Sequence, residues 1–182
     1  LVKDCAQATQ RWDILAIPGV EITHVPKEDI DLVAKTAKKL GAKLVTVHGE
    51  TIVEPVEDGT NEAALRSRWV DVLAHPGLIQ EDHARLAAEN GVFLEISARK
   101  GHSFTNGHVA KVARSAGATI VLDSDAHEPG DLLTPALTRK VALGAGLSEE
   151  EADVLLENNP QLLLARLGVS LAPPSPTARV AS

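Results

Sequence analysis

An apolar run followed by three chemically active side chains stands in the second half of the sequence. Residues 120–122 are Ile-Val-Leu, and Asp123, Asp125 and His127 follow at every second position. Successive side chains of a β-strand alternate between its faces, so these three begin on one side. The apolar run indicates a strand buried in a parallel sheet, and α/β folds bind ligands at the carboxyl ends of such strands. Carboxylates and an imidazole at that position indicate metal binding or proton transfer.

Four other predicted strands also carry a histidine or a carboxylate at or near their carboxyl ends. The first predicted strand is an apolar stretch that starts at residue 13 and ends at Glu21. The second covers 43–48 and ends at His48, and the third covers 70–75 and ends at His75. The fourth covers 92–97 and contains Glu95. Arg99, Lys100 and His102 occupy the loop after the fourth strand. The carboxyl ends of parallel strands meet at one edge of a sheet, so we expect these side chains to converge.

Helical patterns alternate with these strands. They cover residues 26–40, 61–67, 80–90 and 105–116, and three more helices follow at about 134–144, 148–157 and 159–167. Strands recurring roughly every 25 residues between helices predict an α/β fold with a parallel sheet. We expect one domain over residues 1–168 and a disordered Pro-rich tail over 169–182.

Composition limits the function. The chain has 182 residues, 44% of them hydrophobic and 24% charged, as in soluble globular proteins. Its net charge of −7 and its scarcity of aromatic residues argue against nucleic acid as a partner, because Lys, Arg and aromatic side chains bind nucleic acids. The single Cys5 and the absence of a long apolar run predict a cytoplasmic protein with no membrane partner. The oligomeric state stays open.

The types of side chain at the predicted edge select the chemistry. Imidazoles with bridging carboxylates suit Zn, Mn or Fe ions, and a single cysteine argues against a structural zinc site. Several such ions in one pocket lower the pKa of bound water towards ~7 and hold the attacking and leaving oxygens. We therefore expect metal-assisted hydrolysis, most directly of a phosphoester.

Four ordered segments resemble the PHP (polymerase and histidinol phosphatase) family. They are Gly-Val-Glu-Ile at 19–22, Val-His-Gly at 47–49, Ala-His-Pro-Gly at 74–77 and Asp-Ser-Asp-Ala-His at 123–127. The stretch 95–102 is similar to small bacterial histidinol-phosphatase-like members. The resemblance implies a distorted (β/α)7 TIM-like barrel around up to three divalent metal ions. It also implies that metal-activated hydroxide hydrolyses a small phosphomonoester such as histidinol phosphate.

The resemblance assigns metal ligands residue by residue, namely Glu21, His48, His75, Asp125 and His127. Asp125 and His127 are also the expected catalytic groups, since either can assist proton transfer to the leaving alkoxide.

The remaining polar residues at this edge have expected roles from their positions. Arg99, Lys100 and His102 are expected to bind the substrate phosphate, with a solvated basic loop as the alternative. Glu95 and Asp123 are expected to orient the ligands behind the metals.

One departure from the family pattern stands out. PHP proteins begin with a strand carrying His-x-His and have a further histidine after the second strand, and this sequence contains neither. We therefore expect an N-terminally truncated member, with a naturally degenerate protein as the alternative, and the activity of this chain by itself is open. An amidohydrolase-type metallohydrolase and a non-catalytic metal-binding PHP module are the alternatives. The first normally has a bridging lysine, and Lys100 is poorly placed for that role.

Overall fold

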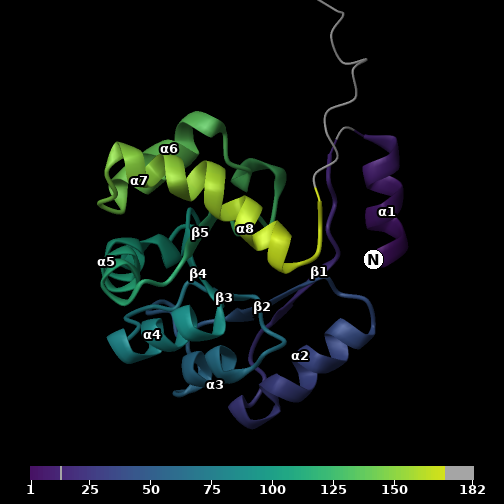
Figure 1. Cartoon of the computed structure of the whole chain (residues 1–182), viewed down its shortest axis with the longest axis horizontal. Helices are drawn as coiled ribbons and strands as arrows, with labels where there is room; N and C mark the ends of the chain where they lie inside the picture. Colours follow the sequence, from purple (N-terminus) through teal and green to yellow (C-terminus); the bar gives the residue numbers. More distant parts are fainter. Residues whose placement is uncertain (13, 171–182) are drawn as a thin grey trace, which may run out of the picture.

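A parallel five-stranded sheet lies at the centre of the molecule in a computed structural model that describes residues 1–12 and 14–170 (Figure 1). The strands are β1 (Gly19–Ile22), β2 (Leu44–His48), β3 (Val72–Ala74), β4 (Phe93–Ser97) and β5 (Ile120–Asp123). They lie side by side in sequence order, and every neighbouring pair is parallel. Connections between parallel strands are almost always right-handed. Because the strands follow one another in sequence order, the connecting helices therefore lie on the same face of the sheet.

The helices between the strands form that outer layer. They are α2 (Ile30–Lys39), α3 (Thr60–Arg66), α4 (Glu81–Asn90) and α5 (Asn106–Ala116), which follow the curve of the strands in Figure 1. The predicted α/β alternation is confirmed, and apart from the start of the first strand no boundary of these elements is displaced by more than four residues. The first strand pairs only from Gly19, because Pro18 has no N–H to donate to a neighbouring strand.

Shorter and terminal helices complete the described chain. They are α1 (Val2–Arg11), η1 (Lys27–Asp29), η2 (His102–Thr105), η3 (Pro129–Asp131), α6 (Pro135–Gly144), α7 (Glu149–Asp153), η4 (Val154–Asn158) and α8 (Asn159–Arg166). α1 has no buried residue and stands apart from the sheet in Figure 1. The helix predicted over 148–157 begins with a Ser148 capping box and continues into the π-helical turn η4.

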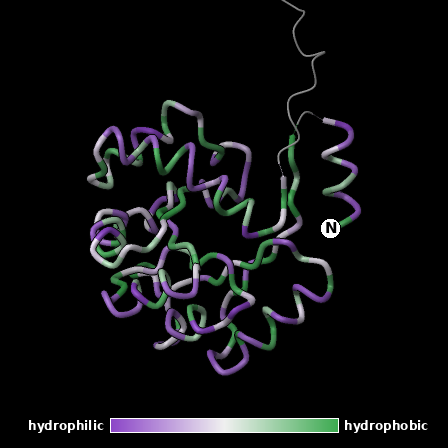
Figure 2. Tube along the Cα trace, viewed as in Figure 1, coloured by the Kyte–Doolittle hydropathy of each residue, from purple (hydrophilic) through white to green (hydrophobic). Residues whose placement is uncertain are grey.

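The two faces of the sheet have different roles. Alternate residues of β2, β3 and β4 point outward into the main core under the helices (Val45, Val47, Leu73, Leu94 and Ile96). The intervening residues near the amino ends of the strands form a second apolar cluster of Val72, Phe93 and Val121, against which Leu44 and Leu163 of α8 pack. In Figure 2 the strands are largely green, while the surrounding helices alternate green with purple.

Further along the strands the same inner face becomes polar. Glu21, Thr46, Glu95 and Asp123 line a cavity there, because they continue the alternation that begins with the second apolar cluster. This face of the sheet is thus apolar near the amino ends of the strands and polar near their carboxyl ends.

The expected closed barrel is not present in the described part of the chain. β1 and β5 are the two edges of an open five-stranded sheet in this part. The tail predicted over 169–182 lies, from residue 171 on, outside the described residues. No helix among the described residues has both the length and the apolar character to cross a bilayer.

Candidate metal centre

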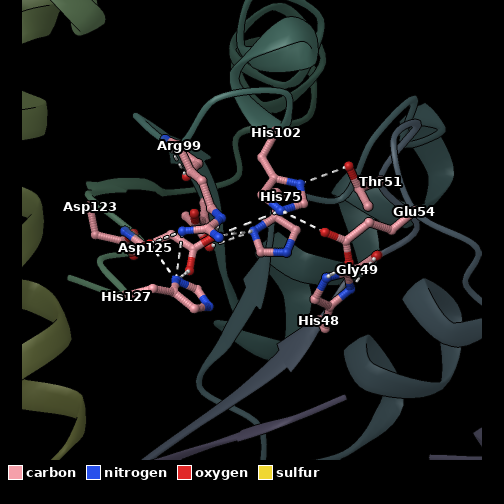
Figure 3. Close-up of polar contacts among 12 residues, drawn as sticks. His48, Gly49, Thr51, Glu54, His75, Arg99, His102, Asp123, Asp125 and His127 are labelled. Carbon is pink, nitrogen blue, oxygen red and sulfur yellow. Dashed lines mark hydrogen bonds and ion pairs between the residues drawn. The ribbon is translucent and has the colours of Figure 1, made fainter. Parts of the chain in front are cut away.

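Three buried histidines meet at the carboxyl edge of the sheet (Figure 3). His48 ends β2, His75 follows β3 and His102 begins η2, and one ring nitrogen from each lies within 4.8 Å of the others. The ring of His75 stacks on that of His102 at a centroid distance of 4.0 Å and meets that of His48 edge-on at 4.4 Å. We call these three side chains the imidazole group. Two were predicted metal ligands, whereas His102 was expected to bind substrate.

Two glycines allow the loops that carry this group to approach each other. A Cβ on Gly49 would lie 2.4 Å from the carbonyl oxygen of Ala74, and one on Gly77 would lie 1.9 Å from that of Glu50. Gly77 also has a φ of 62°, in the left-handed region that favours glycine. The loops after β2 and β3 can therefore pack in direct contact only because both positions lack a side chain.

His75 itself has an unusual backbone conformation. Its φ is 28°, a value that residues with a side chain rarely adopt, and such conformations cost on the order of 1–3 kcal/mol. Backbone strain of this kind gathers at functional sites, where the surrounding structure holds it in place. The conformation turns the imidazole from the end of β3 towards the other two rings.

Two buried asparagines fix the loops. Asn61 accepts a hydrogen bond from the backbone N–H of Glu50 at 3.0 Å and donates one to the carbonyl of Pro76 at 3.0 Å. Asn106 accepts from the N–H of Ser97 at 3.0 Å and donates to the carbonyl of the same residue at 2.8 Å. The loops after β2 and β3 are thereby tied to α3 and the end of β4 is tied to α5, so the imidazoles have defined positions.

Glu54, from the loop after β2, completes the group, although no sequence pattern had identified it. One carboxylate oxygen lies 3.2 Å from Nε2 of His48 and the other lies 3.5 Å from Nε2 of His102. Nδ1 of His48 lies 3.0 Å from the carbonyl oxygen of Gly49, which only accepts, so Nδ1 carries the proton of the neutral ring. The lone pair of Nε2 therefore faces a carboxylate, and only a metal cation or a second proton makes that contact favourable.

Buried atoms without partners supply a second indication of a cation. Among the described residues, Nδ1 and Nε2 of His75 and Oε1 of Glu95 are buried without a hydrogen bond. Each such atom costs about 1–3 kcal/mol, and an ion is one of its recognised explanations. Three imidazoles and one carboxylate also form a donor set that suits tetrahedral Zn²⁺. The residues present therefore fit a divalent metal ion.

An acidic cavity of about 430 Å³ adjoins the imidazole group. His75 borders both, and the cavity also contains the other predicted site residues from β1, β4, β5 and the loop after β5, namely Glu21, Glu95, Asp123, Asp125 and His127. The structure thus brings every predicted metal ligand to one edge. It places Glu21, Asp125 and His127 beside the imidazole group and not within it.

Asp125 connects the cavity with the imidazole group. Its φ is 47°, and its backbone N–H donates to Oδ1 of Asp123 at 2.9 Å. One of its carboxylate oxygens lies 4.0 Å from Nδ1 of His75 and 3.8 Å from Nε2 of His102. The turn after β5 therefore directs this carboxylate towards the histidines.

Arg99 lies beside Asp125 and His127. Its Nε is 3.6 Å from a carboxylate oxygen of Asp125, and its Nη1 is 2.6 Å from Nδ1 of His127. The His127 side chain is 64% exposed, so this pair stands at the solvent side of the cavity. Lys100 is exposed and makes no side-chain hydrogen bond or ion pair with any other described residue. Of the three predicted phosphate-binding residues, Arg99 lies beside the cavity residues Asp125 and His127, His102 belongs to the imidazole group, and Lys100 is exposed.

The protonation states of the centre follow from burial. Loss of hydration lowers the pKa of His75 and also that of His102, so both rings are neutral at neutral pH. Burial, followed by the charge of Asp125, raises the pKa of Glu95 to about 8. Burial and the charge of Glu95 raise the pKa of Asp123 to about 7. Glu95 thus retains its proton at neutral pH, and a bound cation would displace it.

Comparison with known proteins gives three informative relatives, while no family model matches the chain. An uncharacterized protein of Methanocaldococcus jannaschii is 48% identical over 157 residues, which cover 86% of this chain and 72% of the relative. A probable phosphatase of Thermoanaerobacter sp. is 30% identical over 151 residues, covering 74% of this chain and 61% of the relative. Ribonuclease P protein component 3 of Methanosarcina mazei is 30% identical over 168 residues, covering 82% and 70%. The chain thus spans about three fifths of the phosphatase.

Solved structures share the fold. A chain of the cryo-EM structure of archaeal Ribonuclease P with mature tRNA superposes with a TM-score of 0.61 at 20% identity, covering 92% of this chain and 71% of that chain. A crystal structure of an amidohydrolase gives a TM-score of 0.56 at 16% identity, covering 91% and 46%.

One sequence-based expectation is corrected by these findings. We expected no nucleic-acid partner, yet a relative of this chain is a ribonuclease P component. The expectation rested on the net charge of −7, which averages over the whole surface and conceals local concentrations of lysine.

Proposed function

We propose that this chain is a metal-dependent phosphoesterase. It belongs to a PHP-like family together with the Methanocaldococcus jannaschii protein and Ribonuclease P protein component 3 of Methanosarcina mazei. The observation that carries the proposal is the imidazole group, in which neither ring nitrogen of buried His75 has a hydrogen bond among the described residues. The relatives named probable phosphatase support the class of reaction.

The imidazole group, closed by Glu54, would hold a divalent cation. Imidazole and carboxylate donors suit Zn, Mn or Fe ions. When bound, such an ion supplies Lewis acidity and makes water a nucleophile near neutral pH. Further ions would be held in the acidic cavity by the other predicted ligands, Glu21, Asp125 and His127.

The side chains around the cavity have distinct roles in this proposal. Arg99 binds the substrate phosphate, because its guanidinium can offer two parallel N–H groups to phosphate oxygens. His127, exposed beside it, or Asp125 transfers a proton to the leaving alkoxide. Glu95, with a carboxylate oxygen 3.5 Å from Nδ1 of His75, positions that imidazole.

The proposed substrate is a small phosphomonoester, and histidinol phosphate is the specific compound that the PHP resemblance names. We also propose that a longer form of the protein provides the His-x-His strand and closes the (β/α)7 barrel. The chain covers 61% of the length of the probable phosphatase, so such a longer form has a precedent among its relatives.

The test is hydrolysis by zinc-, manganese- and iron-loaded protein of p-nitrophenyl phosphate, histidinol phosphate and a matched amide. Phosphate release that disappears with a chelator and in the His75→Ala variant supports the proposal. Turnover of the amide alone would favour the amidohydrolase alternative. Full metal occupancy without hydrolysis of any compound would favour a non-catalytic metal-binding module.

A second candidate function is association with RNA. The observation favouring it is the Methanosarcina mazei relative, which is named as a ribonuclease P component and matches 82% of this chain. Both functions can reside in one chain, provided that RNA binds away from the acidic edge, whose carboxylates repel phosphates when no metal ion is bound.

A further inference from the structure

A cavity lined by cations lies at the edge of the sheet opposite the metal centre. Its volume is about 270 Å³, and its lining includes Lys38, Lys43 and Arg166. Arg166 also donates hydrogen bonds to the carbonyls of Val70 and Asn90, which precede β3 and β4, so this cavity is at the amino ends of the strands. In Figure 1 the yellow end of α8, which carries Arg166, reaches this edge beside the strands.

A buried carboxylate organises the two innermost cations. Asp71 accepts a hydrogen bond from the backbone N–H of Val45 at 2.8 Å, forms an ion pair with Lys38, and lies 3.3 Å from Nε of Arg166. Lys38 also donates to the carbonyl of Lys43 at 2.7 Å. One carboxylate between two cations leaves a surplus positive charge, and each cation keeps N–H groups free for an anion. Both side chains are already held in place, which reduces the entropy cost of binding.

The adjoining helix extends this positive charge into a row. Residues 32–49 contain four lysines and no acidic residue, although the chain carries a net charge of −7. Lys35, Lys38 and Lys39 are three and four residues apart on α2, so they share one stripe of about 6 Å along the helix axis. Lys35, Lys39 and Lys43 form no ion pair with any described residue. Pairing with Asp71 therefore explains the presence of Lys38 and Arg166 but not that of the other three lysines.

We propose that this row, which we call the basic edge (Lys35, Lys38, Lys39, Lys43 and Arg166), binds the phosphate backbone of RNA. A row of cations matches a polyanion with regularly spaced charges better than it matches a single phosphate group. Lysines that neutralise backbone phosphates release condensed counterions, and this release drives binding. The acidic metal centre at the other end of the strands disfavours binding there, so RNA approaches in one orientation.

The experiment measures binding of a fluorescent RNA hairpin by anisotropy, as a function of salt, in the presence of EDTA. The test variant is Lys35→Gln/Lys39→Gln/Lys43→Gln, which leaves the Lys38–Asp71–Arg166 cluster intact. The control variant, Lys3→Gln/Lys111→Gln/Lys140→Gln, removes the same charge from exposed positions on α1, α5 and α6. Thermal unfolding by circular dichroism verifies that both variants fold.

The test variant should bind RNA at least tenfold more weakly than wild type, and its slope of log affinity against log salt should be shallower by about two to three, since three phosphate contacts are lost. The control variant should differ from wild type much less in both. Equal losses of RNA affinity in the test and control variants would overturn the proposal, because they would show that RNA affinity depends on the net charge of the protein and not on the basic edge. Absence of RNA binding by wild type at low salt would also overturn it. None of these results depends on phosphoesterase activity, and His75→Ala should bind RNA as wild type does.

Discussion

The carboxylate of Glu54 lies 3.2 Å from Nε2 of His48, a nitrogen that has no proton when Nδ1 donates to the carbonyl of Gly49. Two electron-rich atoms at this distance require a positive charge between them or on the ring. The contact and the two nitrogens of His75 that lack a hydrogen bond within the described part of the chain both indicate that this cluster is built to hold a cation or an added proton.

Replacing Glu54 by Gln should separate the stability of the metal-free protein from its affinity for metal. The amide N–H of Gln can donate to Nε2 of His48, so the metal-free protein should gain about 1 kcal/mol in its free energy of unfolding. Zinc affinity should fall by at least about 10- to 100-fold, because that loss already follows removal of a residue that only orients a metal ligand. Urea unfolding with EDTA and isothermal titration with zinc measure the two effects. Unchanged zinc affinity would show that Glu54 does not bind the metal.

Gly49→Ala should destabilise the protein by about 1–3 kcal/mol, because its Cβ would overlap the carbonyl oxygen of Ala74 and separate the loops carrying His48 and His75. The matched control is Gly144→Ala at the end of α6, where a Cβ meets nothing within 4 Å, and it should not destabilise. Urea unfolding compares them. Equal stability of the two variants would mean that the loops tolerate the extra carbon.

Glu95→Gln should change how the stability of the metal-free protein depends on pH. The pKa of Glu95 is raised from 4.5 to about 8 in the folded state, so folding favours its protonated form. Its contribution to stability is therefore complete below pH 4.5 and is lost as pH rises towards 8, by an amount on the order of a few kcal/mol. The Gln variant should lack this decline. Parallel pH profiles of wild type and variant in urea unfolding with EDTA would contradict the assigned environment.

Arg99→Lys should raise KM for a phosphomonoester by about tenfold, because a single ammonium replaces a guanidinium that binds phosphate through two N–H groups. Metal content should stay at the wild-type level. Arg85→Lys on the surface of α4 is the matched control and should leave KM unchanged. A normal KM with reduced metal content would instead assign Arg99 to holding Asp125 and His127 in place.

Much of the fold was predictable because local signals determine it. Apolar runs ending in His48, His75 and Asp123 identified buried parallel strands, and the predicted helices occur between them. Parallel strands bring their carboxyl ends together, so most of the site followed from topology. The closure of a barrel had no comparable local signal, and the described strands form an open sheet.

The parts of the site that the sequence did not predict lie in irregular loops. The position of His102 depends on Asn106 tying the end of β4 to α5, and that of Glu54 depends on the path of the loop after β2. Neither residue lies in a periodic pattern. The basic edge was concealed for another reason, since a net charge carries no information about where the lysines gather.

The most direct test of the account is zinc content after equilibrium dialysis, measured by mass spectrometry for wild type and for the His48→Ala, His75→Ala, His102→Ala and His83→Ala variants. His83 lies on α4, outside the imidazole group, and serves as the control. We predict that each of the first three variants loses at least one equivalent of zinc per chain while remaining folded, and that His83→Ala retains the wild-type content. Wild-type zinc content in His75→Ala would contradict the account.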